Sequence, residues 1–267
     1  KNVRGDIYLK TKLFELLGIS EEKKNLLLLL HNGSKKKETI IESMGISRQA
    51  LIPHVMLLEE NGLIIRQDDS YELTGVGKIT VCEMIPFLET LDFLDNNSGL
   101  LGKYDLDFIP PNLLERFDEL GSLKVKEPPL SEIHEPDREF MDTVSTSYSS
   151  ITTFLYPTFD DFTSRMIEKG ASISVIINQA MLDKLRNDRY DDFKRLLEND
   201  CASVYLYPDD IGFVSFGLTD TCLLLRLLKK NDGFDNRLIM ACSQSAVEWG
   251  KELFEYYKEQ SRLITEV

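Results

Sequence analysis

The residue types that most often carry catalysis are scarce in this sequence, and their spacing does not suit it. The only histidines are His31, His54 and His134. Carboxylate pairs such as Asp160 and Asp161 are sequence neighbours, which usually marks a helix cap or a solvated surface rather than a general acid and base. Neither a glycine-rich phosphate loop nor the G-x-S-x-G of hydrolases occurs. We therefore expect no enzyme, no catalytic residue, no metal site and no cofactor.

A different set of residues is suited to reading DNA, on a helix expected from Arg48 to Asn61. Leu51, Val55 and Leu58 repeat at helical spacing and form its buried stripe. The opposite face carries residues unusual for a solvent-facing surface: Gln49, Ile52, Pro53 and Met56, flanked by Arg48. A glutamine can hydrogen-bond a base edge, and an isoleucine can contact a thymine methyl group. Because local rules such as the exclusion of proline often break at functional sites, we favour a DNA-facing surface over a packing face.

Basic residues around this helix suit the DNA backbone. Lys35, Lys36 and Lys37 precede the helix, and Arg66 follows it. Together with Arg48 they would neutralise phosphates, which positions a protein on DNA without reading its sequence. A lysine triplet is by itself usually a solvated helix start, and only its place in the motif favours a phosphate contact.

The element order from Ser34 to Leu73 predicts how these residues are positioned. Ser34 is expected to cap a first helix, which ends at the turn Gly45 to Ser47. Ser47 caps the second helix, and Asn61-Gly62 stops it. A hairpin from Leu63 to Leu73 follows. This is the pattern of a winged helix-turn-helix, whose second helix enters the major groove of DNA.

Charge is distributed unevenly along the chain. The formal net charge is -14, yet residues 1–73 hold 11 basic and 11 acidic residues, so all of the excess acid lies behind them. The acidic part of the chain after residue 73 would be repelled by DNA, so only the electrically neutral N-terminal part would be expected to bind it. An acidic surface that only favours solubility is compatible with the same distribution.

Cysteine usage and hydropathy favour a reducing cytoplasm with no membrane partner. Cys82, Cys201, Cys222 and Cys242 are far apart and form no C-x-x-C pair, which argues against a zinc site or a disulfide framework. No signal peptide is recognised. The longest leucine run, Leu26 to Leu30, is too short to span a bilayer.

Signals outside the motif predict an α+β fold. Short helices over Tyr8–Leu17 and Ser20–Leu30 precede the motif, and a helix from Thr74 to Asn96 follows it. That last helix either pairs two subunits or packs against its own domain. Helices then alternate with apolar strands, which predicts a helix-covered sheet. The first expected part is a winged helix-turn-helix DNA-binding domain over residues 1–74, followed by a linker or dimerisation helix over 75–98. The last part is an α/β effector-sensing domain over 99–267. The boundary before this domain is marked by the turn-forming residues Asn96–Gly99.

Polar residues lie where the expected sheet would bind a ligand, beyond the carboxyl ends of its strands. Asn178 follows one apolar strand, Tyr205 and Tyr207 end another, Arg226 closes a third, and Trp249 enters from the last helix. These groups beside an apolar wall would suit a small polar or anionic metabolite. Each also has an ordinary alternative role, with Asn178 as a helix cap, the tyrosines at the sheet edge and Trp249 as plain core.

Several stretches resemble known regulators. Ser47–His54 followed by Leu58–Ile64 resembles archaeal winged-helix transcriptional regulators. Two further regions resemble the effector domain of FilR-type regulators of methanogenic archaea, the methanogenesis regulatory protein family. They are Asp105–Pro110 with Leu113–Arg116, and Ala246–Gly250 with Leu253–Tyr257. The resemblance implies a homodimeric transcription factor with a sensory C-terminal domain. It also implies a phospholipase-D-like sheet, as in sugar-sensing archaeal regulators. The H-x-K-x-x-x-x-D motif of active phospholipase D enzymes is absent, so hydrolysis is not implied.

Two functions follow as expectations. The first is a homodimeric regulator that binds double-stranded DNA and is tuned by a small-molecule effector. The alternative is an architectural or partner-recruiting DNA binder whose C-terminal domain docks protein and binds no ligand. A concave apolar site with convergent polar groups would favour the first.

Overall fold

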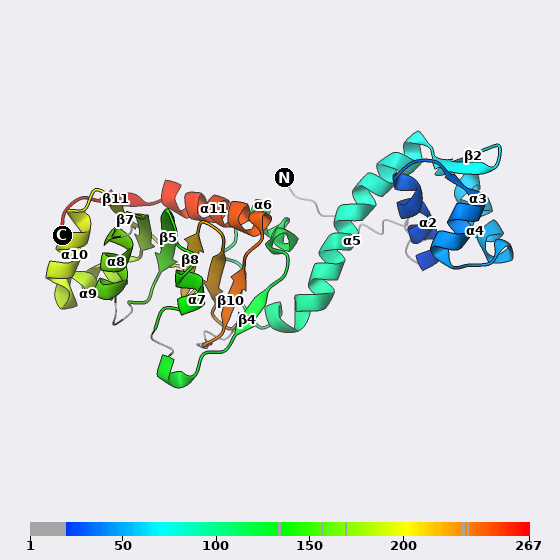
Figure 1. The fold of residues 1–267 in the computed structure, drawn as a ribbon. Helices are drawn as coiled ribbons and strands as arrows, with labels where there is room; N and C mark the ends of the chain where they lie inside the picture. Colours follow the sequence, from blue (N-terminus) through cyan, green and yellow to red (C-terminus); the bar gives the residue numbers. More distant parts are fainter. Residues whose placement is uncertain are drawn as a thin grey trace, which may run out of the picture. The chain divides into compact units, whose positions relative to one another are not determined.

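The computed structural model describes residues 20–132, 135–155, 157, 159–168, 170–230, 233 and 235–267, and Figure 1 draws it as a ribbon. The chain forms two compact units, Lys1–Glu89 and Thr90–Val267. The predicted α+β class is confirmed, with a small sheet and a large one, each packed with helices. The helix expected over Tyr8–Leu17 lies outside the described residues.

The first unit is a winged helix-turn-helix. Its helices are α2 (Glu21–His31), α3 (Lys37–Met44) and α4 (Arg48–Glu60), and its strands are β1 (Lys35–Lys36), β2 (Ile64–Gln67) and β3 (Ser70–Leu73). The strands form an antiparallel sheet in the order β1-β3-β2. Leu26, Ile40, Leu51 and Leu58 are fully buried where the three helices meet. Burial of this apolar surface is the main favourable term that holds the helices together.

Local signals fix the limits of these helices. The Ser47 hydroxyl accepts from the Ala50 amide at 3.2 Å and begins α4. Gly45 closes α3 at a φ of 63°, in the left-handed region that favours glycine. The expected cap at Ser34 is wrong. Lys35 and Lys36 instead pair with Tyr71 and Ser70 of β3, so their backbone groups serve the sheet and α3 begins only at Lys37.

The long helix α5 (Gly75–Leu101) runs through the sequence that was expected to end it. The side-chain amides of Asn96 and Asn97 donate to the carbonyls of Asp92 and Phe93, both at 2.8 Å, so they bond back along the helix instead of turning the chain. The division between the two compact units falls inside α5, between Glu89 and Thr90, rather than at Asn96–Gly99.

The second unit is a mixed sheet between two layers of helices. After α5 its elements are α6 (Pro111–Leu114), η1 (Phe117–Leu120), β4 (Lys124–Lys126), η2 (Leu130–Glu132), α7 (Arg138–Met141), β5 (Ser147–Thr152), α8 (Phe159–Glu168), β6 (Ser172–Ile177), α9 (Gln179–Asp188), α10 (Tyr190–Leu197), β7 (Ala202–Leu206), β8 (Ser215–Thr219), β9 (Leu223–Arg226), β10 (Leu238–Ala241), α11 (Gln244–Glu259) and β11 (Arg262–Ile264). The strand order is β11-β7-β6-β5-β8-β9-β10-β4. Strands β5, β6 and β7 are parallel to one another, and the other pairings are antiparallel.

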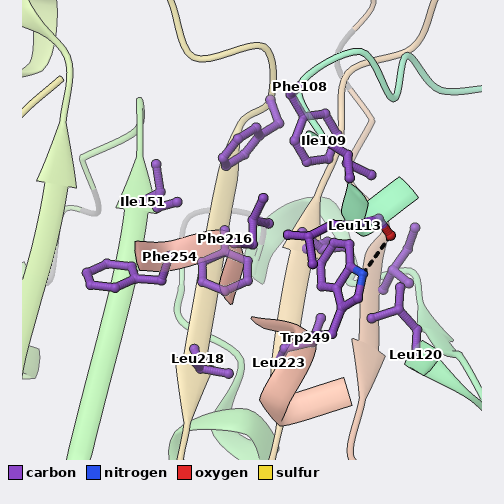
Figure 2. Packing of buried hydrophobic residues seen from close by; sticks show 14 of the residues in the cluster. Phe108, Ile109, Leu113, Leu120, Ile151, Phe216, Leu218, Leu223, Trp249 and Phe254 are labelled. Atoms are coloured by element: carbon purple, nitrogen blue, oxygen red, sulfur yellow. Dashed lines mark hydrogen bonds between the residues drawn. The ribbon is translucent and has the colours of Figure 1, made fainter. Parts of the chain in front are cut away.

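The two faces of this sheet have separate cores. Helix α11 covers one face together with α6 and η1, and Figure 2 shows Trp249 and Phe254 of α11 lying against Phe216 and neighbouring strand residues. The opposite face packs against α8, α9 and α10 at one end and against Phe140 of α7 at the other. Because side chains alternate along a strand, neighbouring residues such as Leu225 and Leu224 belong to different cores.

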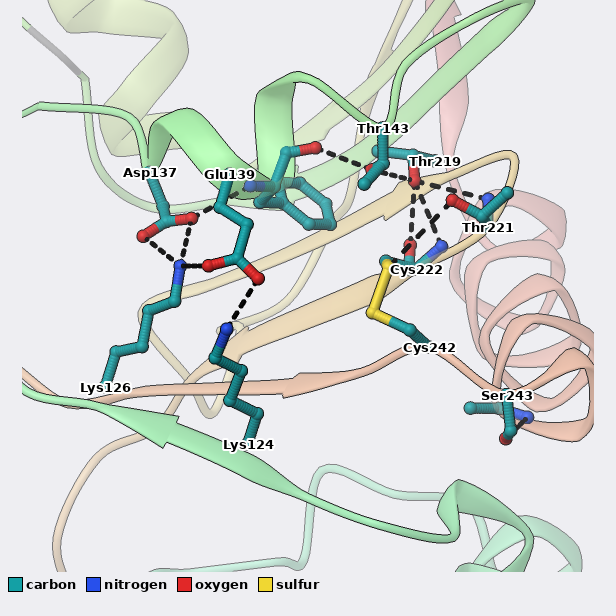
Figure 3. The surroundings of a disulfide bond; sticks show 12 residues. Lys124, Lys126, Asp137, Glu139, Thr143, Thr219, Thr221, Cys222, Cys242 and Ser243 are labelled. Carbon is teal, nitrogen blue, oxygen red and sulfur yellow. Dashed lines mark hydrogen bonds and ion pairs between the residues drawn. A yellow bond between two sulfur atoms is a disulfide. The ribbon is translucent and has the colours of Figure 1, made fainter.

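Cys222 and Cys242 form a disulfide, so the expectation that the cysteines are unpaired is wrong for this pair (Figure 3). Their Cα atoms are 4.1 Å apart, although the residues are separated by 20 positions in sequence. The cause is strand pairing, because Leu223 of β9 lies opposite Ala241 of β10 and the two cysteines continue that register. Cys82 and Cys201 are exposed free thiols.

Reduction of the disulfide is expected to destabilise the second unit. Closing a loop of this length restricts the unfolded chain, which corresponds to about 3 kcal/mol of unfolding free energy. Urea unfolding with and without dithiothreitol measures the difference, with a Cys82→Ala, Cys201→Ala variant to remove the free thiols. Thiol titration of the unreduced, denatured chain should find only the two free cysteines. A titration that finds all four thiols would contradict the pairing.

Candidate nucleic-acid interface

The outward face of α4 presents apolar and polar side chains to solvent. Ile52 is 43% exposed and Met56 is 53% exposed, while Leu51, Val55 and Leu58 on the inner face are buried. Arg48, Gln49 and Pro53 are also exposed and come from the same helix. The structure therefore brings together the helix residues predicted to read DNA. A hydrogen-bonding side chain beside exposed apolar groups is what readout of base edges in a major groove requires.

Pro53 lies inside α4 and has no N–H to donate to the carbonyl of Gln49 one turn earlier. The helix nevertheless continues to Glu60, because its inner face is fixed by the core. His54 is half buried, in agreement with a packing position. Among the described residues, no group of three His, Cys, Asp or Glu side chains is placed to hold a metal ion.

The predicted phosphate-binding residues come from the sheet and from the start of α3. Arg66 on β2 and Lys35 on β1 both lie opposite Tyr71 of β3, so they belong to the same cross-strand row. Lys36 is exposed in the neighbouring row, and Lys37 is half buried at the start of α3. The Arg66 Nε donates to the Asp68 carbonyl at 2.9 Å, which orients its guanidinium along the hairpin.

An exposed apolar residue on the hairpin was missed by the sequence reasoning. Ile65 of β2 is 48% exposed, although its neighbour Ile64 is buried. Alternation along the strand explains the difference between the two. No local signal shows which of two adjacent isoleucines faces solvent until the hairpin register is known.

The residues proposed for effector binding do not gather around one cavity. The Asn178 side chain accepts from the Met181 amide at 3.0 Å and caps α9. Trp249 is fully buried and donates through Nε1 to the Leu113 carbonyl at 2.9 Å (Figure 2). Arg226 lies on β9, which is separated from β7 by β6, β5 and β8. Strand order, which local sequence does not reveal, keeps these groups apart.

The two tyrosines of β7 and its end lie in the α11 layer. Tyr207 packs against Tyr257 with ring centroids 5.0 Å apart. Burial raises the pKa of both Tyr207 and Tyr257, so both remain neutral phenols at physiological pH. Tyr205 is half buried, with the Lys258 ammonium 5.9 Å from its ring centroid. Tyr207 thus shares the α11 core with Trp249, and Arg226 lies on the other face of the sheet.

The helices α3 and α4, the hairpin of β2 and β3, and the exposed outward face of α4 give the first unit the fold of a winged helix-turn-helix domain. Two family models match the chain: the N-terminal domain of the methanogenesis regulatory protein FilR1 over residues 11–92, and the middle domain of the same protein over residues 133–260. By these two domains the chain belongs to the FilR1 family.

A curated relative agrees with this assignment. The chain is 28% identical over 217 residues to the methanogenesis regulatory protein FilR1 of Methanothrix harundinacea (strain 6Ac). The match covers 78% of this chain and 48% of the relative, so the chain spans about half of the relative's length.

Two solved structures match much of the chain at low sequence identity. TrmBL2, described as an archaeal chromatin protein with a novel mode of DNA binding, is 11% identical and matches with a TM-score of 0.43, over 93% of this chain and 97% of its own. The phospholipase D family member Nuc from Salmonella typhimurium is 10% identical with a TM-score of 0.38, over 54% of this chain and 99% of its own. Among the described residues, no helix is long and apolar enough to cross a membrane.

Proposed function

We propose that the chain is a homodimeric, sequence-specific reader of double-stranded DNA that regulates transcription, and that its second unit tunes DNA binding in response to a small-molecule effector. The observation that carries the proposal is the outward face of α4, where Ile52 and Met56 are exposed beside Gln49 on a capped helix. Such apolar exposure is costly in water and useful against base edges and thymine methyl groups. Membership of a regulatory family supports the same function.

Phosphate contacts by the basic residues are tested by salt dependence. Lys36→Ala is expected to weaken binding about equally on all DNA sequences and to reduce the slope of log affinity against log salt by about 1, because one fewer counterion is released. Mobility shifts with DNA from upstream of the chain's own coding region, at several salt concentrations, measure both effects. Lys251→Ala, an exposed lysine on α11, is the matched control and should change neither. Absence of a specific shift by the wild type at every salt concentration would contradict the proposed function.

The proposed dimer would form through α5. Val76, Ile79 and Phe87 are 53%, 68% and 53% exposed, and their spacing along the helix puts them on one side. One recognition helix reads only a few base pairs, and paired half-sites are the usual way to lengthen the sequence that is read. A second copy of the chain would cover this apolar side.

Ile79→Glu is expected to convert the dimer into a monomer, because it places a charge in the apolar contact. Light scattering should give twice 30.7 kDa for the wild type and 30.7 kDa for the variant. Lys78→Glu alters an exposed neighbour that points to the other side of α5, and it should leave the mass unchanged. A wild type that is monomeric at working concentration would count against the dimer.

The alternative function, a DNA binder whose second unit docks protein, is favoured by one observation. Within the second unit an open groove of about 760 Å³ is lined mainly by apolar side chains, including Phe93, Leu94 and Leu114. Leu94 and Leu114 are 42% and 44% exposed. An effector-independent regulator would use such a surface for a partner, whereas effector tuning requires a site that holds a small molecule.

A further inference from the structure

The two cysteines of the disulfide differ in their exposure to solvent. The bond between them closes one end of the β9–β10 strand pair (Figure 3). Cys222 is 4% exposed, whereas Cys242 is an exposed residue. Thiol–disulfide exchange begins when a thiolate attacks one of the two sulfurs, and its rate depends on access to that sulfur. A thiol in solution can therefore approach the disulfide from the side of Cys242 and not from that of Cys222.

Cys222 would be a poor nucleophile once the disulfide is opened. It belongs to the apolar cluster on the α7 face of the sheet, with Phe140 and Leu224. The Thr221 hydroxyl donates a weak hydrogen bond to its Sγ at 3.9 Å. Burial in apolar surroundings favours the neutral thiol over the thiolate, and only the thiolate attacks disulfides. A small thiol bound to Cys242 would therefore persist until a second small thiol removes it.

Hydrogen bonds hold Cys222 in place independently of the disulfide. Its amide donates to Thr219 Oγ1 at 3.1 Å, and its carbonyl accepts from the Thr219 amide at 2.8 Å. Opening the disulfide leaves both of these bonds in place. The freedom that is gained therefore falls on Cys242 and on Ser243, which follows it and caps α11.

The start of α11 is bonded to an element that packs against α5. The hydroxyls of Ser243 and Ser245 donate to the Glu119 carbonyl of η1 at 3.5 and 2.7 Å. Phe117 of the same η1 packs against Phe93 of α5, with ring centroids 5.8 Å apart. Helix α5 begins in the first unit and ends in the second. A change at the start of α11 thus has a continuous set of contacts through which it can reach α5.

We propose that the pair Cys222 and Cys242 is a reversible thiol switch, and that Cys242 is the residue at which a low-molecular-weight thiol attacks it. Proteins that bind DNA work where thiols are kept reduced, and disulfides that occur there are usually transient. This last argument and any role in tuning DNA binding rest on the proposed function. The exchange at Cys242 rests on the exposure and contacts of the two cysteines alone.

The exchange has two balanced steps. The attacking thiolate forms a bond to Cys242 Sγ, the disulfide bond breaks, and its electron pair leaves on Cys222 Sγ, which takes a proton from water. A second small thiolate then attacks the sulfur of the first and releases the Cys242 thiolate. The protein disulfide is reduced to two thiols, and two small thiols are oxidised to their own disulfide.

Selectivity for Cys242 is tested with two single-cysteine forms of the full chain, both carrying Cys82→Ala and Cys201→Ala to remove the free thiols. Each folded form is incubated with oxidised glutathione, and its intact mass is measured. Cys222→Ser, which keeps Cys242, should gain one glutathione per chain. Cys242→Ser, which keeps Cys222, is the matched form and should gain none until urea unfolds it. Equal gain by the two folded forms, or no gain at Cys242, would overturn the proposal.

A second measurement covers the case in which a single-cysteine form does not fold. The Cys82→Ala, Cys201→Ala chain, with its disulfide intact, is treated with reduced glutathione, quenched with acid and digested for mass spectrometry. Glutathione should be found on Cys242 and a free thiol at Cys222. Glutathione on Cys222, or a disulfide that reacts only after unfolding in urea, would overturn the proposal.

Control of DNA binding is tested separately, with DNA from upstream of the chain's own coding region. Reduction by glutathione should change the Kd for this DNA by about tenfold. A chain with Cys222→Ser and Cys242→Ser should bind as the reduced chain does and should not respond to glutathione. Exchange without a change in Kd would support the site at Cys242 and overturn its role in tuning. A chain that binds no DNA in either state would contradict the proposed function, while the result at Cys242 would still stand.

Discussion

Met56→Glu is expected to lower the affinity for DNA by about 100-fold while leaving the fold unchanged. Met56 is 53% exposed on the outward face of α4, so its replacement removes no core packing. In the proposed complex the new carboxylate would face the negatively charged groove and would lose the apolar contact as well. Fluorescence anisotropy with labelled duplex DNA measures the change in Kd.

Leu263→Glu provides the matched control for this prediction. Leu263 is also 53% exposed but lies on β11 of the second unit, so the same change in charge is made away from α4. It should bind DNA as the wild type does. If Met56→Glu and Leu263→Glu weaken binding equally, the effect comes from net charge alone and the reading face is not on α4.

Trp249→Ala is expected to destabilise the second unit by about 3–5 kcal/mol. Trp249 is fully buried between α6, η1 and the sheet, and its ring lies 5.7 Å from that of Phe117. The substitution leaves a large cavity and also removes the donor to the Leu113 carbonyl. Urea unfolding followed by circular dichroism measures the change, since the variant lacks the only tryptophan.

Trp249 was also proposed as the wall of an effector site, and the same experiment separates the two roles. A core residue costs stability when it is truncated, whereas a wall residue costs ligand binding. Lys251→Ala, two residues further along α11 and exposed, should change the unfolding free energy by no more than about 0.5 kcal/mol. A Trp249→Ala variant as stable as Lys251→Ala would contradict the core role.

The parts of the fold that local signals determine were predicted well. Helix α4 has its serine cap, its buried stripe at helical spacing and its Asn-Gly stop, and it extends from Arg48 to Glu60 as expected, to within a residue. Strand β6, Ser172–Ile177, is one of the apolar strands that were expected to alternate with helices. Each of these signals involves residues a few positions apart in the sequence. A single sequence therefore contains the information needed to predict these element limits.

The errors concern pairings between distant segments. Strand β11 pairs with β7 after the last helix, and the disulfide joins Cys222, just before β9, to Cys242, just after β10. Neither contact depends on a local sequence pattern. The effector residues were grouped because each follows or ends a strand. Strand order and side-chain alternation instead place Arg226 on the face opposite Tyr207. Sequence periodicity predicts that a strand has two faces, but not which neighbour each face meets.

The most direct test of the account is selection of bound duplexes from a random DNA library by the wild type and by Gln49→Ala. If the outward face of α4 reads base edges, the wild type should enrich one sequence motif. Gln49→Ala should then enrich the same motif with the preference lost at one base pair, because a single bidentate contact is removed. Enrichment of no motif by the wild type, or of an identical motif by Gln49→Ala and the wild type, would contradict the claim that Gln49 on α4 reads the sequence.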